Sequence, residues 1–354
     1  MASSFGNNIK ITIFGGSHEP NVGLEIEGLP KGIKINKSFI DKELDKRKPH
    51  DELSTSRIEK DEPIFLSGLD NWTTTGDTIK FIIENSNIRN NDYVKGVIRP
   101  GHADYTNYIK YGDKYSFEGG GLSSGRSTAP LVVLGAICKQ LLEEKGIIIG
   151  SHISEIHGIK DNSFTGNLIK EIHQLNESLF PVLDNEVSNK MKKEIIKAKD
   201  NKDSVGGSLE TVIIGIEPGI GEPYFDSIES IISHLLFSIP GVKGVTFGDG
   251  VSFAQKYGSE ANDEIRYIDG NIVFKSNHNG GINGGISNGM PICFKTYIKP
   301  TSSVAKKQES INIETKENID LEINGRHDPC IVHRARAAVE AMIAYAILDL
   351  MMEK

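Results

Sequence analysis

The sequence predicts a layered α+β protein in which buried helices lie between sheets. Two stretches, 131–142 and 335–348, are apolar on almost every face, and a helix of that kind is normally buried. Strand-like segments bracket both stretches, so sheets on either side would cover them. No Pro/Ser-rich linker divides the 354 residues. We therefore expect one domain over 1–354, with the polar stretch 184–207 as the one candidate excursion from it.

The elements follow from their patterns in chain order. Apolar runs predict strands at 10–14, 22–29, 79–85, 210–216, 271–275 and 291–298. Pro49 stops a short helix over 37–48. Ser127 or Thr128 is expected to cap a helix over 128–144. Further helices are expected over 183–199, 225–238 and 328–352.

Composition excludes several classes of protein. The formal net charge of −8 argues against a general nucleic-acid or membrane-surface binder, so any positive site must be local. Cys138, Cys293 and Cys330 are widely spaced and odd in number, which predicts neither a zinc site nor a disulfide framework. The first residues lack a basic-then-apolar signal, and no apolar run reaches transmembrane length. We expect a cytoplasmic protein without a bound metal.

The stretch GGGLSSGRSTAP, residues 119–130, suits a ligand with negative charge or a flat polar ring. Its glycines permit positive φ and a close approach of the backbone. Successive backbone N–H groups, with Ser123, Ser124 and Arg126, can bind an anion. The lysine of a phosphate-binding P-loop and the spacing of a dinucleotide fingerprint are both missing. The alternative is a structural glycine bend.

Two histidines stand in polar turns. Ser17 and His18 follow a predicted strand in FGGSHEP, and His102 lies in a Pro-Gly turn near Asp104. Histidine can act as an acid near neutral pH. Each can equally be an ordinary turn residue.

Charged residues also stand where a loop becomes the last buried helix. Arg326, His327 and Asp328 occupy that junction, and charges near a core need partners. Asp328 can alternatively cap the helix. Arg47 and Arg57, taken singly, read as solvated surface charges. Together, these features predict that the protein binds a ligand with several negative charges and a planar ligand.

Long motifs in a fixed order identify a family. The chain carries FGGSH, RPGHADYT, GGGLSSGRST, DSVGG, GDG, GSEAND, SNHNGGINGGISNGMPI, KPTSS and GRHDPC. In these motifs it resembles chorismate synthase nearly from end to end. The resemblance implies a sandwich of antiparallel sheets around helices, and a homotetramer. It also implies that reduced FMN assists the loss of phosphate and a ring hydrogen from 5-enolpyruvylshikimate 3-phosphate, giving chorismate in the shikimate pathway.

The resemblance also assigns roles to residues. His18 matches the histidine that protonates the leaving phosphate, His102 the one that stabilises flavin charge, and Asp328 the carboxylate at flavin N5. The positions that match substrate contacts are Ser17, Arg47, Arg57 and Arg126. The positions that match flavin contacts are Leu122, Ser123, Ser124, Pro240, Gly241, Gly284, Lys299, Pro300, Thr301, Ser302, Ser303 and Arg326.

Two departures from the family pattern bear on ligands. Leu122 and Leu53 stand where the family has arginines. Lysines also flank Arg47 in a region credited with nicotinamide contact, and no dinucleotide fingerprint follows a strand. We therefore expect an external flavin reductase to supply the reduced flavin. The rival readings are a phosphate-ester hydrolase with a His-Asp pair and a flavin-storing protein without catalysis.

Overall fold

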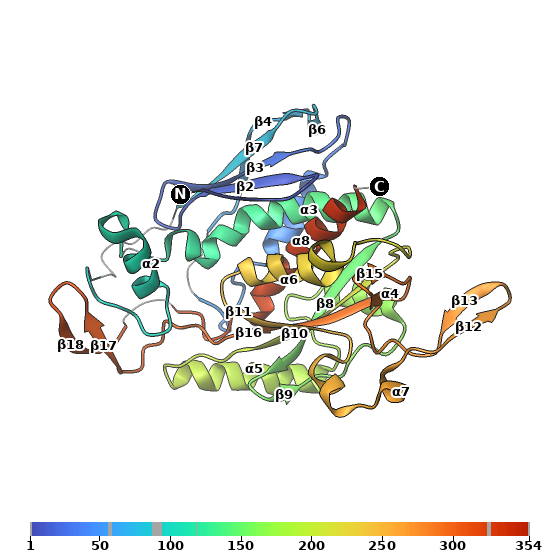
Figure 1. Ribbon diagram of the computed structural model, residues 1–354. Coiled ribbons are helices and arrows are strands. Elements are labelled where there is room, and N and C mark those ends of the chain that lie inside the picture. The colour runs from blue at the N-terminus through green and yellow to red at the C-terminus, as the bar shows by residue number, and fades with distance from the viewer. Residues whose placement is uncertain (1, 56–58, 87–93, 118, 324–326, 353–354) are drawn as a thin grey trace.

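The fold is a sandwich of two antiparallel sheets around a layer of helices (Figure 1). The computed structural model describes residues 2–55, 59–86, 94–117, 119–323 and 327–352. Two residues predicted for the site, Arg57 and Arg326, lie outside the described residues, as does the side chain of Leu122. The sandwich confirms the predicted fold class.

The first sheet contains the N-terminal strands in the order β1-β2-β3-β7-β4, and every pair is antiparallel. Its strands are β1 (Ala2–Phe5), β2 (Lys10–Gly15), β3 (Asn21–Glu27), β7 (Ile79–Glu84) and β4 (Pro63–Ser67). Burial alternates along β7, where Ile79, Phe81 and Ile83 are buried and the residues between them are not. That period of two fits a sheet with one face on the core and one toward water.

The second sheet has the order β11-β16-β10-β8-β9, and it is also antiparallel throughout. Its strands are β11 (Val242–Phe247), β16 (Ile292–Ile298), β10 (Gly207–Ile214), β8 (Ile148–Ile156) and β9 (Ile159–Lys160). Unlike β7, β8 is buried along nearly its whole length. The reason is that α4 (Leu168–Asn176) and α5 (Asn185–Asp200) cover the outer side of this sheet.

Between the sheets run α3 (Thr128–Glu144), α8 (Val332–Met351) and α6 (Ile228–Ser238). The backbones of α3 and α8 approach so closely that a Cβ built on Gly135 would lie 2.2 Å from the Cβ of Ala341. Small residues at this crossing allow two nearly wholly apolar helices to pack side by side. Both helices are buried along most of their length, as the sequence predicts.

A short helix, α1 (Lys37–Asp45), joins this layer through buried charges. Lys139 of α3 donates to Glu43 of α1 and to Glu340 of α8, each at 2.6 Å, and Lys46 donates to Glu43 at 2.5 Å. Burial raises the pKa of Glu43, but Lys139 and then Lys46 outweigh it and lower the pKa to about 2. The network therefore stays charged and ties three helices together.

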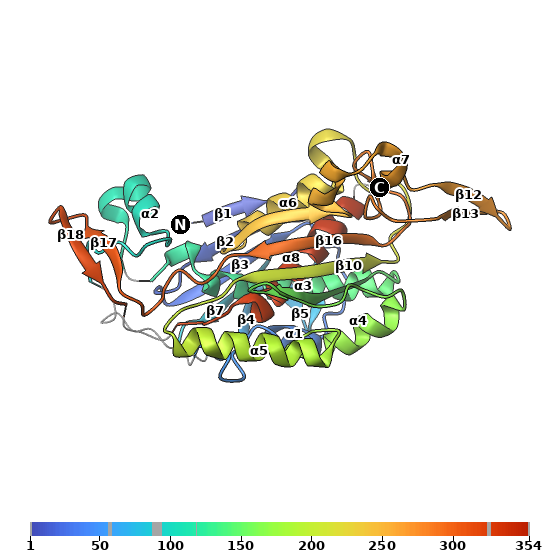
Figure 2. The same ribbon diagram turned by 90° about the horizontal axis from the view of Figure 1, so that it is seen from below.

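The remaining elements lie around this sandwich. Two hairpins, β12–β13 and β17–β18, project from its opposite ends (Figures 1 and 2). The bounds are α2 (Asp104–Tyr111), α7 (Gly258–Ala261), β5 (Leu69–Asp70), β6 (Thr73–Thr74), β12 (Ile265–Ile268), β13 (Asn271–Phe274), β14 (Ile282–Asn283), β15 (Ile286–Ser287), β17 (Gln308–Asn312) and β18 (Glu317–Leu321).

The structure decides two questions about helix caps. Ser127 is the N-cap residue of α3, one of the two predicted, but its hydroxyl makes no capping bond, because a 3-10 turn over Gly125–Ser127 leads straight into that helix. Asp328 does not cap α8, which begins four residues later at Val332. Both side chains are thereby left for other partners.

The α3–α8 crossing yields a stability prediction. Gly135→Ala should destabilise the protein by about 1–3 kcal/mol, because the new methyl group would overlap Ala341. Helix propensity alone gives the opposite sign, about 1 kcal/mol of stabilisation. Urea unfolding measures the difference. The matched control is Gly258→Ala, where a Cβ would meet nothing within 4 Å. Equal stabilities for the two variants would contradict the tight crossing.

Candidate active site

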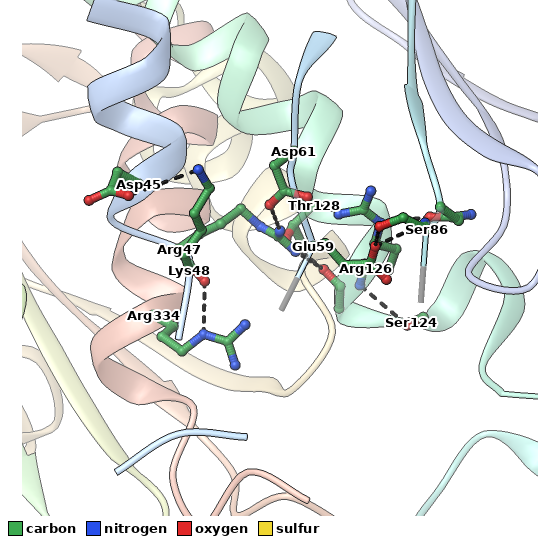
Figure 3. A network of polar contacts seen from close by, with 12 residues as sticks. Asp45, Arg47, Lys48, Glu59, Asp61, Ser86, Ser124, Arg126, Thr128 and Arg334 are labelled. Carbon is green, nitrogen blue, oxygen red and sulfur yellow. Dashed lines mark hydrogen bonds and ion pairs between the residues drawn. The ribbon is translucent and has the colours of Figure 1, made fainter. Parts of the chain in front are cut away.

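A cavity of about 280 Å³ opens where the N-terminal ends of α3 and α8 meet. Its volume is close to the lower end of small-molecule sites, about 300 Å³. The segments that line it lie far apart in the sequence, and Figure 3 shows several of its polar side chains with their neighbours. The predicted site residues among them are Arg47, Ser124, Arg126, Pro240 and Asp328.

The carboxylate of Asp61 joins two of the predicted anion-binding arginines (Figure 3). Arg47 Nη1 donates to Asp61 Oδ2 at 2.5 Å, and Arg126 Nη1 donates to Asp61 Oδ1. Burial raises the pKa of Asp61, but Arg47 and then Arg126 lower it overall, so the carboxylate is ionised. Only 11% of the Arg47 side chain is exposed, so Arg47 is not a solvated surface charge.

The guanidinium groups of Arg47 and Arg126 also donate hydrogen bonds to backbone carbonyl and side-chain amide oxygens. Arg126 Nε donates to Asn85 Oδ1 at 2.7 Å, and its Nη2 donates to the carbonyl of Glu84 at 3.0 Å. Arg47 Nη2 donates to the carbonyl of Gly125 at 3.1 Å. The planar fork of arginine, held at several points, presents its remaining N–H groups in a fixed direction.

Asp328 also lines the cavity. Its Oδ1 accepts from Arg334 Nη1 at 2.6 Å and from the backbone N–H of Thr55 at 2.9 Å. Arg334 in turn donates from Nε to the carbonyl of Arg47 at 2.8 Å. Asp328 is therefore tied through Arg334, in the first turn of α8, to the backbone of Arg47.

The cavity is positive although the chain is acidic. Its described lining has four cationic and three acidic side chains, a formal balance of +1 against −8 for the whole sequence. The cations are Arg47, Lys48, Arg126 and Arg334, and the acids are Glu59, Asp61 and Asp328. This is the local positive site that the sequence led us to expect.

His18 lies against the start of the glycine-rich loop. A Cβ on Gly119 would lie 2.1 Å from the His18 ring, so only glycine permits this approach. His18 Nδ1 and Ser17 Oγ are 3.0 Å apart, and Ser17 is buried. The backbone N–H of Ser17 also donates to the carbonyl of Gly121 at 3.4 Å.

His102 reaches the same glycine through a charged cluster. His102 Nδ1 is 2.8 Å from Asp104 Oδ1, which also accepts from Arg99 Nη2 and from the hydroxyl of Tyr115. Arg99 Nη2 donates to the carbonyl of Gly119 as well, at 2.9 Å. Burial raises the pKa of Asp104, but Arg99 and His102 together hold it well below its usual value. His18 thus lies directly against Gly119, and His102 is linked to the same residue through Arg99.

The predicted flavin-contact loop 299–303 approaches the His102 turn. Lys299 Nζ donates to the carbonyl of Gly101 at 2.6 Å and to Ser302 Oγ at 2.7 Å. Desolvation, and then Lys243, lower the pKa of Lys299. Among the described residues, Thr301 Oγ1 is buried without a hydrogen-bond partner.

One predicted flavin contact lies elsewhere. Gly241 accepts from the Lys299 backbone N–H at 2.9 Å and follows the C-terminal end of α6. Gly284 lies at the other end of that helix, because the next residue, Gly285, accepts from the N–H of Ile228. Eleven helical residues separate the two ends by about 16 Å. Within one chain, Gly284 is not brought together with the other positions.

Sequence reasoning missed Asp61, Arg99 and Arg334. Asp61 and Arg126 are 65 positions apart, and nothing in the sequence pairs them. Arg334 was visible only as a charge inside an apolar helix pattern. Leu53, which the resemblance matches to an arginine position of the family, is buried in the hydrophobic core. The chain therefore uses that position for packing and not for an anion.

The sequence model of the chorismate synthase family matches residues 9–352. The chain belongs to this family. The chorismate synthase of Korarchaeum cryptofilum is 41% identical over 349 residues, which cover 98% of this chain and 96% of that protein. The chorismate synthase of Methanocaldococcus jannaschii is 41% identical over 371 residues, covering 100% of this chain and 97% of that one.

A solved structure agrees with this assignment. It is described as "Crystal Structure of Chorismate Synthase" and superimposes with a TM-score of 0.75 at 26% identity, covering 99% of this chain and 93% of its own. Chorismate synthases are carbon–oxygen lyases that act on a small molecule and use a flavin. In the part of the chain that the structure describes, no helix is long and apolar enough to cross a bilayer.

The geometry around the glycine-rich loop fits a flavin. A Cβ on Gly121 or Gly125 would meet nothing within 4 Å, so the loop leaves open space beside its backbone. In the loop 299–303, the buried hydroxyl of Thr301 has no hydrogen-bond partner among the described residues, which costs about 1–3 kcal/mol until one is supplied. A bound polar molecule beside that loop can supply the partner.

The Asp61 bridge yields a prediction with a defined pH dependence. Asp61→Asn should destabilise the protein at pH 7 by about 3–5 kcal/mol, because two buried guanidinium groups lose their counter-charge. The folded-state pKa of Asp61 lies below its ordinary value of 3.8. The stabilisation is therefore complete above that pH and is lost as the pH falls through the folded-state pKa.

Urea unfolding of wild type and variant at pH 7 and pH 3 measures this effect. The control is Asp45→Asn, since Asp45 is half exposed and its two basic neighbours, His50 at 3.3 Å and Lys48 at 3.9 Å, are partly exposed as well. Its effect should stay within about 0.5 kcal/mol. If Asp61→Asn behaves like Asp45→Asn, the two arginines do not depend on Asp61.

Proposed function

We propose that this chain catalyses the elimination of phosphate and a ring hydrogen from 5-enolpyruvylshikimate 3-phosphate to give chorismate. The observation that carries the proposal is the fixed arginine pair, Arg47 and Arg126, on one wall of a positive cavity in an acidic protein. The substrate bears two carboxylates and a phosphate. Guanidinium groups bind such anions through paired hydrogen bonds.

We assign His18 to the leaving phosphate. Negative charge builds on an oxygen as the C–O bond breaks, so an imidazolium and nearby arginines at that end lower the barrier. The position of His18 against Gly119 and Ser17 supports this role, because it places the ring at the edge of the anion-binding loop. His18 would donate its proton to the departing phosphate.

The assigned cofactor is reduced FMN. When bound, it supplies an electron-rich ring that assists the loss of a poorly acidic hydrogen. Ser123, Ser124 and the loop 299–303 would hold it beside His102. Asp104 and Arg99 fix the orientation of the His102 ring. Asp328, which lines the same cavity, would hold or release a proton there.

The wider assignments rest on the family resemblance. We propose that the chain acts as one domain in a cytoplasmic homotetramer. A single hydrophobic cluster that includes both Ile9 and Leu350 supports the one-domain assignment. Another copy of the chain in such an assembly is where Gly284 would find the rest of a flavin site. We also propose that a separate reductase supplies the reduced flavin.

The central experiment is anaerobic turnover. Purified protein, substrate and dithionite-reduced FMN should release phosphate and form chorismate in equal amounts. Oxidised FMN with NADPH should give neither product until a flavin reductase is added. Phosphate release without flavin would favour a phosphate-ester hydrolase, and flavin binding without turnover would favour a storage protein. Sustained turnover with NADPH and oxidised FMN alone would remove the need for a reductase.

The same assay tests the two histidines. His18→Ala and His102→Ala should each slow turnover by about 10²–10⁴-fold, the range for a positioned proton donor. Circular dichroism should show intact folding, because both residues lie in turns outside the hydrophobic core. Wild-type rates in a folded variant would exclude that histidine from the mechanism.

A further inference from the structure

Arg334 stands at the first turn of α8 and belongs to none of the assigned contacts. Its side chain is 17% exposed and lines the cavity. Nη1 donates to Asp328 Oδ1 at 2.6 Å, while Nε donates to the carbonyl of Arg47 at 2.8 Å. A single guanidinium therefore contacts the carboxylate assigned to proton transfer and the backbone of an arginine assigned to the substrate.

The hydrogen bonds that Asp328 accepts are not shared equally between its two carboxylate oxygens. Both donors, Arg334 Nη1 and the Thr55 N–H, go to Oδ1. Among the described residues, none donates to Oδ2. A carboxylate held through one oxygen keeps its orientation and leaves the other oxygen for the reacting molecules.

We propose that Arg334 is a positioning residue that orients Asp328 so that Oδ2 is its working oxygen. Arg334 also couples the place of Asp328 to that of Arg47, so the proton-transfer group and the anion-binding wall keep a fixed separation. This inference rests on the proposed function for the role of Asp328. It concerns only how this chain holds its own side chains.

Arginine suits this task better than lysine. The planar guanidinium reaches two acceptors in fixed directions, whereas an ammonium is a point charge on a flexible stem. A displacement of about 1 Å in a catalytic group can cost about 10²-fold in rate. We therefore expect Arg334→Gln to lower kcat by about 10²-fold and to leave KM within about threefold. Arg334→Lys should lie between wild type and Arg334→Gln.

A double-mutant cycle separates positioning from independent action. If Arg334 acts through Asp328, then adding Arg334→Gln to the Asp328→Ala variant should lower its turnover rate by no more than about threefold. The matched control is Lys48→Gln, which also removes one positive charge from the cavity lining but contacts Asp45 and not Asp328. Lys48 does not act through Asp328, so the rate losses of Lys48→Gln and Asp328→Ala should multiply in the double variant.

Crystal structures supply a readout that does not depend on activity. In Arg334→Gln without ligands, Asp328 should rotate and lose its hydrogen bond from Thr55. Arg334→Lys gives the same readout if Arg334→Gln fails to fold.

An unmoved Asp328 in the crystal structure, or rate losses of Arg334→Gln and Asp328→Ala that multiply in the double variant, would overturn the proposal. So would a higher KM with unchanged kcat, because Arg334 would then be an anion contact. If the wild type shows no turnover, the proposed function fails. The crystal structures would still show whether Arg334 orients the side chain of Asp328.

Discussion

The structure depends on the close crossing of α3 and α8 at Gly135 and Ala341. Because these helices are apolar on nearly all sides, they are stable only when sheets cover both faces of their layer. Their packing also holds their N-terminal ends together. The glycine-rich loop leads into α3, and the segment with Asp328 leads into α8, so one contact in the core places both at the same cavity.

The second organising principle is the pairing of three aspartates at the site with arginines. Asp61 holds Arg47 and Arg126, Asp104 holds Arg99, and Asp328 holds Arg334. Each carboxylate offsets the cost of burying a guanidinium and fixes its direction. The cavity thus keeps a small positive balance, with several arginine N–H groups already oriented for an anion. This arrangement explains how an acidic chain presents a local positive site.

Much of the fold could be predicted from the sequence, because the strongest patterns of apolar and polar residues are local. The bounds of α3 match the prediction at both ends, since a polar glycine loop changes abruptly into an apolar run. Strand β8, next to the central strand β10, was missed. It carries buried Ser151 and His152, whose polarity hides the strand pattern, and its burial comes from α4 and α5 on the outer face.

The sequence by itself determined the family, the order of the elements and the types of residue at the site. It placed His18, His102 and Asp328 next to glycines and turns, where local patterns are informative. The tertiary structure alone decided which charges meet. Asp61 finds Arg126 across 65 positions, and Arg47 reaches Arg334 across 287. It also placed Gly284 at the far end of α6. Such pairings depend on how sheets and helices stack, and short-range sequence patterns carry no information about contacts between distant segments.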